Sequence, residues 1–260
     1  TQREPRLAPW LYAFAVSSRD ADTLERLSAL ADGVVTWGGD GAVSALRRLA
    51  PPGCKLMEWG HRLSFAYVAG YEDREAEWSA LARHIVRTGG LLCSSCQVIF
   101  LDTDRPEEGE AFCQAFLPLL NQAARERNRD GAAQAALYTH TYRLEGLAEG
   151  AGERIWFGEG CSLTWKPDRD LELSPLYGNV LVKCLPRGEL LPVLRRQKGR
   201  LQTAGLLCRA EEREELTALL AQAGVTRITR AGEMSRTFSG EAHDGEYSLR
   251  RYIRLVDTET

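Results

Sequence analysis

The spacing of apolar residues predicts short strands alternating with helices over the first 70 residues. Consecutive apolar runs indicate strands at 11–17, 34–37, 55–59 and 63–70. One helix is expected to begin at Asp22, with Glu25 three residues after this cap and Gly33 at its end. A second helix is expected from Asp40 until Pro51 stops it. Repeated strand–helix–strand units of this length favour a parallel sheet covered by helices.

The same alternation continues along the rest of the chain. Helical spacing is found at 73–90, 107–127 and 211–224, and strand patterns at 97–101, 200–208 and 225–229, with strand-type patterning over 150–185. We therefore predict an α/β protein. A partial Rossmann-type unit ends near residue 60, and a second α/β domain follows it.

Composition narrows the class of protein. With 44% apolar and 27% charged residues, the 260-residue chain has the composition of a soluble globular protein. Its net charge of −3 hides no basic block, so nucleic acid is not an expected partner. No apolar run approaches the roughly 20 residues that span a bilayer. Seven cysteines without regular spacing favour the reducing cytoplasm over a disulfide framework.

A glycine-rich turn follows the second expected strand in "TWGGDGAVSALRR". Gly38, Gly39, Asp40 and Gly41 open a helix whose first backbone N–H groups and dipole suit a phosphate group. The dinucleotide fingerprint is incomplete, however. A tight turn that needs glycine only for its backbone freedom explains the same residues.

Glu58 ends an otherwise apolar strand in "LMEWGHRLSF". A carboxylate there is costly unless it faces a cleft, and in open α/β sheets the cleft lies at the carboxyl ends of the strands. Such a glutamate can be a general base with a raised pKa. Taken alone, a salt bridge to one of the many arginines is the better explanation.

Cys93 follows two glycines in "GGLLCSSCQVIFLD". It suits a nucleophile if the thiol is accessible, and Ser94, Ser95 and Gln97 would leave room for a substrate carbonyl. A metal site would need further ligands, and none of the four histidines has zinc-type spacing to it. A redox pair with Cys96 would be expected at a helix start rather than before a strand. Most buried cysteines are inert core residues, so the residue alone decides nothing.

The combination of these three elements resembles the aldehyde dehydrogenase superfamily, in which a cofactor turn, a general-base position and a thiol nucleophile follow at much the same spacing. The segments "WGGDGAVSALRRLAPPG", "WGHRLSFAYV" and "CSSCQVIFLD" are most similar to fatty acyl-CoA reductases of bacterial luminescence operons. "SPLYGNVLVKCL" is similar to the family's aromatic-glycine segment and puts Tyr177 at the aromatic position. "GEAHDGEYSLRRYIRLVDTE" resembles its C-terminal end. The resemblance covers nearly the whole chain and is strongest over 34–102.

The resemblance implies a reductase that converts a thioester to a fatty aldehyde. Cys93 would attack the acyl carbonyl of a fatty acyl-CoA or of an acylated partner protein, and NADPH or NADH would supply hydride. Glu58 would assist proton transfer. Tyr177 and the turn at 38–41 would border the cofactor.

The resemblance also assigns roles to the parts of the chain. Residues 1–60 would be the C-terminal part of the dinucleotide-binding domain, residues 61–235 the catalytic domain, and residues 236–260 a tail that can serve oligomerisation. A homo-oligomer is expected. The whole resembles the C-terminal half of such an enzyme.

Two alternatives stay open. Acyl-CoA-reducing members of the superfamily often lack a glutamate at the position of Glu58, because a base that activates water would hydrolyse the acyl-enzyme. Glu58 therefore leaves room for a hydrolytic NAD(P)-dependent aldehyde dehydrogenase. A half-enzyme that keeps the fold without a complete cofactor site is the second alternative.

Overall fold

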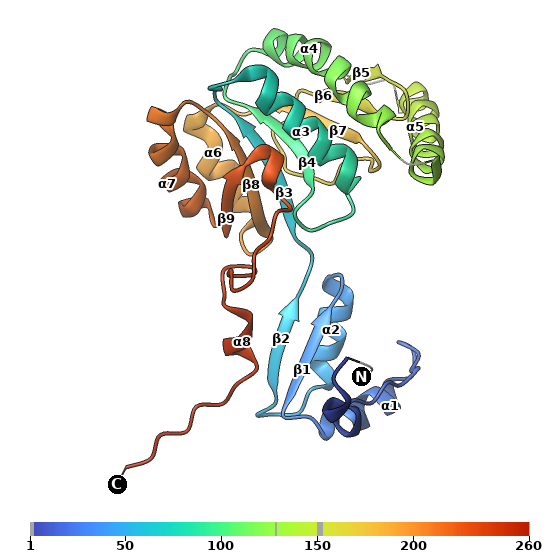
Figure 1. The fold of residues 1–260 in the computed structure, drawn as a ribbon, viewed down its shortest axis with the longest axis vertical. Coiled ribbons are helices and arrows are strands. Elements are labelled where there is room, and N and C mark those ends of the chain that lie inside the picture. Colours follow the sequence, from blue (N-terminus) through green and yellow to red (C-terminus); the bar gives the residue numbers. More distant parts are fainter. Residues whose placement is uncertain (1–2, 128, 150–152, 260) are drawn as a thin grey trace. The chain divides into compact units, whose positions relative to one another are not determined.

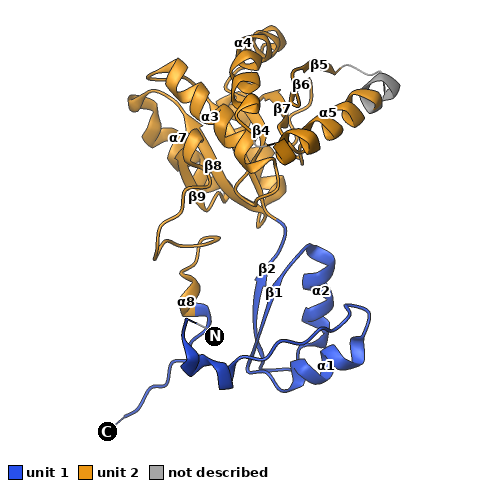
Figure 2. Ribbon diagram, turned by 45° about the vertical axis from the view of Figure 1, so that its right-hand side comes forward, with its two compact units in different colours: residues 1–61, 251–260 blue, residues 62–250 orange. Residues whose placement is uncertain are grey.

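The computed structural model describes residues 3–127, 129–149 and 153–259, and the chain forms two compact units. Unit 1 consists of residues 1–61 with 251–260, and unit 2 consists of residues 62–250 (Figure 2). The roles that the resemblance assigns to the segments 1–60, 61–235 and 236–260 stay predictions.

Unit 1 is built on one strand–helix–strand repeat (Figure 1). Its elements are η1 (Pro5–Trp10), α1 (Ala21–Ala29), β1 (Gly33–Trp37), α2 (Asp40–Leu49) and β2 (Lys55–Trp59). β1 and β2 pair in parallel, with Trp37 opposite Trp59. Because the strands are parallel, the turn that follows β1 and the end of β2 lie at the same edge of this sheet. α2 begins and ends where the glycine turn and Pro51 predict.

Two expectations for the N-terminal region are wrong. Residues 11–17 form no strand, since within the described part of unit 1 the two strands pair only with each other. An isolated apolar run has no ladder to join, and Leu11, Tyr12 and Phe14 are exposed. The first helix is capped by Asp20 rather than Asp22, because the Asp20 carboxylate accepts from the Thr23 N–H at 3.1 Å. That helix ends at Ala29, and Gly33 starts β1.

Unit 2 is a seven-stranded sheet with helices on both faces (Figure 1). The strand order is β5-β6-β7-β4-β3-β8-β9, and all pairs are parallel except β5 with β6. The strands are β3 (Leu63–Val68), β4 (Cys96–Leu101), β5 (Arg154–Phe157), β6 (Ser162–Lys166), β7 (Asn179–Cys184), β8 (Leu201–Leu207) and β9 (Arg227–Arg230). The helices are α3 (Arg74–Thr88), α4 (Pro106–Arg125), α5 (Arg129–Glu149), α6 (Arg187–Leu194), α7 (Arg213–Ala223) and α8 (Ser248–Arg251), with single turns η2 (Arg195–Gln197), η3 (Ala210–Glu212) and η4 (Ala231–Glu233).

Alternating strand residues divide the core between the two faces of this sheet. Ala66 and Ile99 pack with α3 and α4 on one face, while Phe65, Val98 and Phe100 pack with α6 and α7 on the other. The strands β3, β4 and β8 are buried along their whole length. This explains why they read as continuous apolar runs rather than alternating ones.

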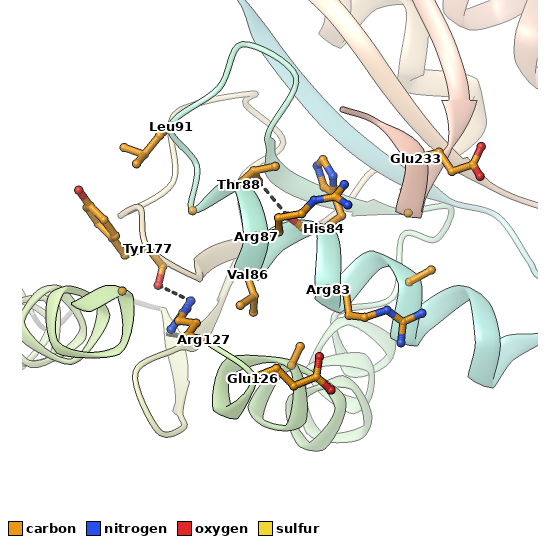
Figure 3. Close-up of a pocket in the computed structure, with 15 residues that line it drawn as sticks. Arg83, His84, Val86, Arg87, Thr88, Leu91, Glu126, Arg127, Tyr177 and Glu233 are labelled. Atoms are coloured by element: carbon orange, nitrogen blue, oxygen red, sulfur yellow. Dashed lines mark hydrogen bonds between the residues drawn. The ribbon is translucent and has the colours of Figure 1, made fainter. Parts of the chain in front are cut away.

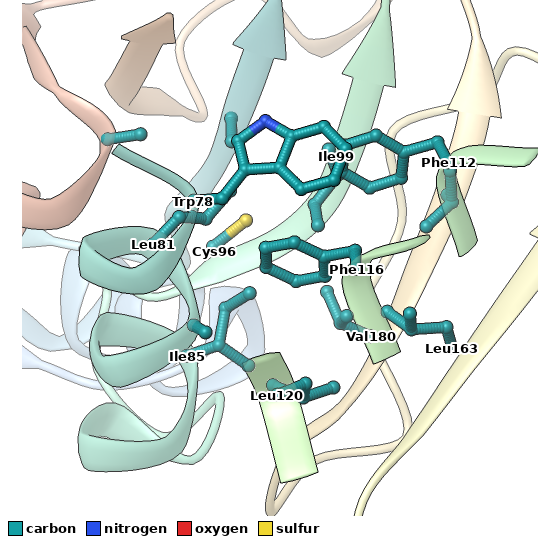
Figure 4. Packing of buried hydrophobic residues seen from close by; sticks show 14 of the residues in the cluster. Trp78, Leu81, Ile85, Cys96, Ile99, Phe112, Phe116, Leu120, Leu163 and Val180 are labelled. Atoms are coloured by element: carbon teal, nitrogen blue, oxygen red, sulfur yellow. The ribbon is translucent and has the colours of Figure 1, made fainter. Parts of the chain in front are cut away.

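An aromatic cluster joins α3 to α4 (Figure 4). The Trp78 ring lies 4.8 Å from that of Phe112 and 5.7 Å from that of Phe116, both edge to face. Such pairs add about 0.5–1.5 kcal/mol each beyond the area they bury. Cys96 belongs to this cluster, at the start of β4. The cluster fixes α3, and therefore the segment that leads from α3 to β4.

The helices α5 and α6 were not expected from the sequence. α5 is rich in alanine, and its large apolar residues Leu137 and Leu144 are exposed while the small Ala135 is buried, so no apolar stripe marks it. α6 contains Pro192, which argues against a helix in a pattern read locally. In the residues that the structure describes, no helix has the length and apolar character to cross a membrane.

Candidate functional site

Cys93 lies in the loop between α3 and β4 and is exposed. α3 ends at Thr88, and Gly89, with φ +57°, caps it through its N–H to the Ile85 carbonyl; Gly90 follows with φ +78°. Two successive residues in the left-handed region turn the chain sharply, a conformation that only glycine adopts without strain. The two glycines therefore turn the chain out of α3 toward the thiol.

A buried serine on a neighbouring strand holds this loop. The Ser64 hydroxyl donates to the Cys93 carbonyl at 2.6 Å and accepts from the Thr203 N–H at 3.0 Å. The pairing register of β3 shifts just after Ser64, as expected where an irregularity re-aims a side chain. Within the loop, Ser95 closes the turn by accepting from the Leu92 N–H at 2.9 Å. Two hydrogen-bonding serines thus position the backbone around Cys93.

The backbone N–H groups of Cys93 and Ser94 donate to no acceptor in the part of the chain that the structure describes. Unpaired N–H groups are unusual in folded proteins unless they face solvent or a ligand. Beside a thiol, such donors can stabilise the oxygen of a tetrahedral adduct. The loop therefore combines an accessible sulfur with two available donors.

Cys96 does not share the environment of Cys93. It is buried, and burial raises the pKa of its thiol to about 12. All seven cysteines are free thiols. Among the described residues, no group of three or more His, Cys, Asp or Glu side chains could hold a metal. One exposed and one buried thiol do not make the accessible pair that a redox motif requires.

Ser95 and Gln97 have a structural role rather than the one expected from the sequence. Both are buried, so neither leaves room for a substrate carbonyl. The Gln97 amide donates to the Gly90 carbonyl at 2.9 Å, and its oxygen accepts from the Ser174 N–H at 3.1 Å and from the Ser174 hydroxyl at 2.8 Å. Gln97 therefore ties the Cys93 loop to the segment that carries Tyr177.

The backbone at Tyr177 is strained. Leu176 and Tyr177 have φ of 68° and 50°, and Gly178 follows with φ 93°. Non-glycine residues in this region cost of order 1–3 kcal/mol each and persist only when neighbours hold them, often at functional sites. The Tyr177 N–H donates to the Gly89 carbonyl at 2.7 Å. The structure thus brings Tyr177 and the Cys93 loop together.

Two further residues hold this strained segment, and neither was singled out from the sequence. Buried Asn179 donates through its side chain to the Leu176 carbonyl at 2.8 Å. Arg127 donates to the Tyr177 carbonyl at 2.8 Å, and the Tyr177 ring lies 4.3 Å from that of Tyr138. An asparagine in an apolar strand, in "YGNVLV", was the one signal that the sequence offered for such an anchor.

The glycine turn of unit 1 lies next to the end of β2. The Gly38 N–H donates to the Trp59 carbonyl at 3.2 Å. Gly39 is the N-cap of α2 and has no side-chain cap, and a Cβ added at Gly39 or Gly41 would meet no atom within 4 Å. An uncapped helix start with open space before it suits an anionic group. Asp40 opens the helix itself.

Glu58 is bound by an arginine of α2. The Arg47 guanidinium donates to both carboxylate oxygens of Glu58, at 2.8 and 2.6 Å. This hydrogen-bonded pair lowers the pKa of Glu58 below its ordinary value of 4.5. The expected raised pKa is therefore wrong, and the salt-bridge explanation describes the residue as the structure shows it. Glu58 and the glycine turn belong to unit 1, whereas Cys93 and Tyr177 belong to unit 2.

Comparison with solved structures shows which known proteins share this fold. The Δ-pyrroline-5-carboxylate dehydrogenase of Mycobacterium tuberculosis aligns with a TM-score of 0.59 at 13% identity over 95% of this chain and 54% of its own. Succinic semialdehyde dehydrogenase from Streptococcus pyogenes, in a structure with NADP⁺, aligns with a TM-score of 0.56 at 12% identity, covering 83% of this chain and 50% of its own. The fold is that of aldehyde dehydrogenases.

Sequence comparison narrows the class to one family. The long-chain acyl-protein thioester reductase of Aliivibrio fischeri is 25% identical over 92% of this chain and 49% of the relative. A second such reductase, from Photobacterium leiognathi, is 26% identical over 93% of this chain and 50% of the relative. The chain thus spans about half the length of these relatives. The family model for acyl-CoA reductase (LuxC) matches residues 8–255, and the chain belongs to this family.

Proposed function

We propose that this chain carries the thioester-reducing centre of an acyl reductase that forms a fatty aldehyde, with Cys93 as its nucleophile. Three lines support the proposal: membership of the acyl-CoA reductase family, the names of the long-chain acyl-protein thioester reductases, and the geometry around Cys93. The single observation that carries it is an exposed thiol on a hydrogen-bonded loop beside two backbone N–H groups without described acceptors.

The first step is an acyl transfer. The Cys93 thiolate attacks the carbonyl carbon of the thioester, and the carbonyl oxygen takes up negative charge beside the N–H groups of Cys93 and Ser94. The adduct collapses with cleavage of the original carbon–sulfur bond. The donor leaves as a thiolate that takes a proton from solvent, and the acyl group stays on Cys93.

A nicotinamide cofactor fits the residues at the predicted positions. The uncapped start of α2 and the open space at Gly39 and Gly41 suit the phosphates of NADPH or NADH, and Asp40 lies at the same turn. Tyr177 presents its ring from the segment that is tied to the Cys93 loop. When bound, the cofactor supplies the hydride that, with one proton, converts the acyl group to an aldehyde and frees Cys93.

The Arg47–Glu58 pair favours reduction over hydrolysis. A base that activates water must accept a proton, and Brønsted behaviour favours a pKa near the working pH. Both Glu58 oxygens accept from Arg47, and the pKa of Glu58 lies below its ordinary value. We therefore propose that Glu58 is at best a weak base, so that the acyl-enzyme survives until hydride transfer. Water attack, as in a hydrolytic aldehyde dehydrogenase, is the less favoured outcome.

The donor is proposed to be a fatty acyl-CoA or an acylated partner protein, as the names of the family and of its relatives suggest. A cytoplasmic location fits seven cysteines that are all free thiols. We also propose that the protein forms a homo-oligomer.

The test uses the full-length protein. Cys93→Ala is expected to abolish both labelling by radioactive acyl-CoA and aldehyde formation. Cys54→Ala, which removes a partly exposed thiol of unit 1, should leave both unchanged. Aldehyde formation by the Cys93→Ala enzyme would refute the proposal. Failure of the 260-residue chain to bind NADPH or NADH would favour a non-catalytic half-enzyme instead.

A further inference from the structure

A cavity of about 710 Å³ adjoins the Cys93 loop in unit 2 (Figure 3). Its walls come from the second half of α3, the end of α4, the Tyr177 segment and η4. Gly89 and Leu91 line it and belong to the segment that leads to Cys93. Its volume lies within the range of about 300–1,000 Å³ typical of small-molecule sites.

Arginine side chains give the cavity a positive wall. Arg83 and Arg87 lie one turn apart on α3 and have no ion pair or hydrogen-bond acceptor for their side chains among the described residues. Among the described residues, the Arg127 side chain donates to the uncharged carbonyls of Gly160 and Tyr177, and burial lowers its pKa. No carboxylate neutralises these three guanidinium groups in the described contacts.

Two carboxylates also line the cavity, but they do not balance its charge. Glu233 is paired with Arg236 at 2.9 Å, and Arg236 lies outside the lining. Only Glu126 then stands against three arginines. The chain has a net charge of −3, whereas this cavity has a local excess of positive charge. It indicates an anionic ligand.

A buried histidine points to a ligand independently of the arginines. His84 lines the cavity at 1% exposure, and neither ring nitrogen makes a hydrogen bond within the described residues. Burial and the nearby Arg87 lower the pKa of His84 to about 4. The Ser94 backbone raises this pKa to a smaller extent, although it makes no hydrogen bond to the imidazole. The imidazole is therefore neutral and offers one donor and one acceptor. Buried polar groups without partners are rare in folded proteins and call for an explanation.

We infer that this cavity binds the phosphate-bearing pantetheine arm of the thioester donor. The inference rests on the proposed function and names the part of the donor that the enzyme recognises. Guanidinium groups bind phosphate through paired, charge-assisted hydrogen bonds, which suits Arg83 and Arg87 to the phosphate. The apolar side chains of Val86 and Leu91 offer a surface to the pantetheine chain on the way to Cys93. CoA and a phosphopantetheinylated carrier protein share this arm.

The test compares two donors that differ only by one phosphate. Acylation of Cys93 in the full-length enzyme is timed with acyl-4′-phosphopantetheine and with acyl-pantetheine at limiting concentration. Wild-type enzyme should prefer the phosphorylated donor by about tenfold or more. The double variant Arg83→Ala/Arg87→Ala should lose this preference, so that its rates with the two donors become equal. Both arginines are exposed on a helix, and alanine favours a helix, so folding should be retained.

A matched control removes one exposed arginine elsewhere. Arg26→Ala, on α1 of unit 1, should keep the full preference for the phosphorylated donor. Comparing the wild-type rates with acyl-CoA and with an acylated carrier protein identifies the physiological source as the donor that reacts faster at limiting concentration. An unchanged preference in the double variant, or equal wild-type rates with both pantetheine donors, would overturn the inference alone. No acylation by any of these donors would overturn the proposed function, and the inference with it.

Discussion

The hydroxyl of Ser64 donates to the Cys93 carbonyl at 2.6 Å from a fully buried position on β3. The same oxygen accepts from the Thr203 N–H of β8, so one hydroxyl couples the loop to two strands of the central sheet. The position of the proposed nucleophile is therefore fixed by the core of unit 2 as well as by its own loop. This coupling makes the loop sensitive to a residue that does not touch the substrate.

Ser64→Ala is expected to destabilise unit 2 by about 1–3 kcal/mol, because the Thr203 N–H and the Cys93 carbonyl both lose a buried partner. Acylation of Cys93 should also slow, since the loop loses its anchor. Chemical unfolding and acyl labelling measure the two effects. Ser239→Ala, at an exposed position of unit 2, serves as the control and should change neither. If Ser64→Ala were as stable as the wild-type protein, the Ser64 hydroxyl would not stabilise the loop.

Gly90→Ala is expected to destabilise the protein by more than about 1 kcal/mol and to impair acylation. Gly90 has φ +78°, and an added Cβ would lie 3.0 Å from Leu176 Cδ2 and 3.2 Å from the Ser174 hydroxyl. The substitution therefore strains the backbone and pushes the Tyr177 segment away. Gly188→Ala on α6 meets no atom within 4 Å and should stabilise by about 0.5–1 kcal/mol. Equal unfolding midpoints for the two variants would contradict this assignment.

Local patterns predicted much of the fold because the central strands β3, β4 and β8 are short apolar runs, and because α1, α3 and α7 have an aspartate cap or a glycine stop. The run at 11–17 was misassigned because a strand needs a partner, which a local pattern does not contain. α5 was not predicted because its buried positions are small residues such as Ala135, while Leu137 and Leu144 are exposed. A hydrophobic pattern predicts which face of a helix is buried only where the large apolar side chains are the buried ones.

Gly39→Ala is expected to lower the affinity for NADPH by about tenfold or more, with a loss of stability of at most about 1 kcal/mol because alanine is a poorer N-cap than glycine. An added Cβ at Gly39 meets no protein atom within 4 Å, and its φ of −69° suits any residue. The methyl group would occupy the space through which a phosphate approaches the start of α2. Cofactor fluorescence titration of the full-length enzyme measures the change. Unaltered affinity would show that the glycines serve only the tight turn.

The Arg47–Glu58 pair predicts a pH-dependent contribution to stability. The pKa of Glu58 is lower in the folded protein than its ordinary 4.5, so the pair stabilises the folded state above that pH. The stabilisation is lost as the pH falls through the lowered folded value. Arg47→Ala should therefore unfold more easily than wild type at pH 7 and equally easily at strongly acidic pH. The neighbouring exposed Arg48→Ala should show no such pH dependence, and a difference that persists in acid would refute the pairing.

Cys93, Glu58, Tyr177 and the glycine turn were singled out from the sequence, and their roles in a site stay predictions. The surroundings of these residues were not predicted. The Arg47 partner of Glu58 lies on another element, and the sequence only showed that many arginines were available. Gln97 was read as a neighbour of substrate, whereas it is buried and bonds to Ser174, 77 positions further along the chain. Hydrogen bonds between distant segments leave no periodic signal.

The most direct measurement is the site of acylation in the absence of cofactor. The full-length protein is mixed with a fatty acyl-CoA and digested. Peptide mass spectrometry then shows which of the seven cysteines of this chain carries an acyl group. The account predicts a hydroxylamine-sensitive acyl group on the peptide that contains Cys93, in an amount that approaches one per chain. An acyl group carried instead by another cysteine, with Cys93 unmodified, would contradict it.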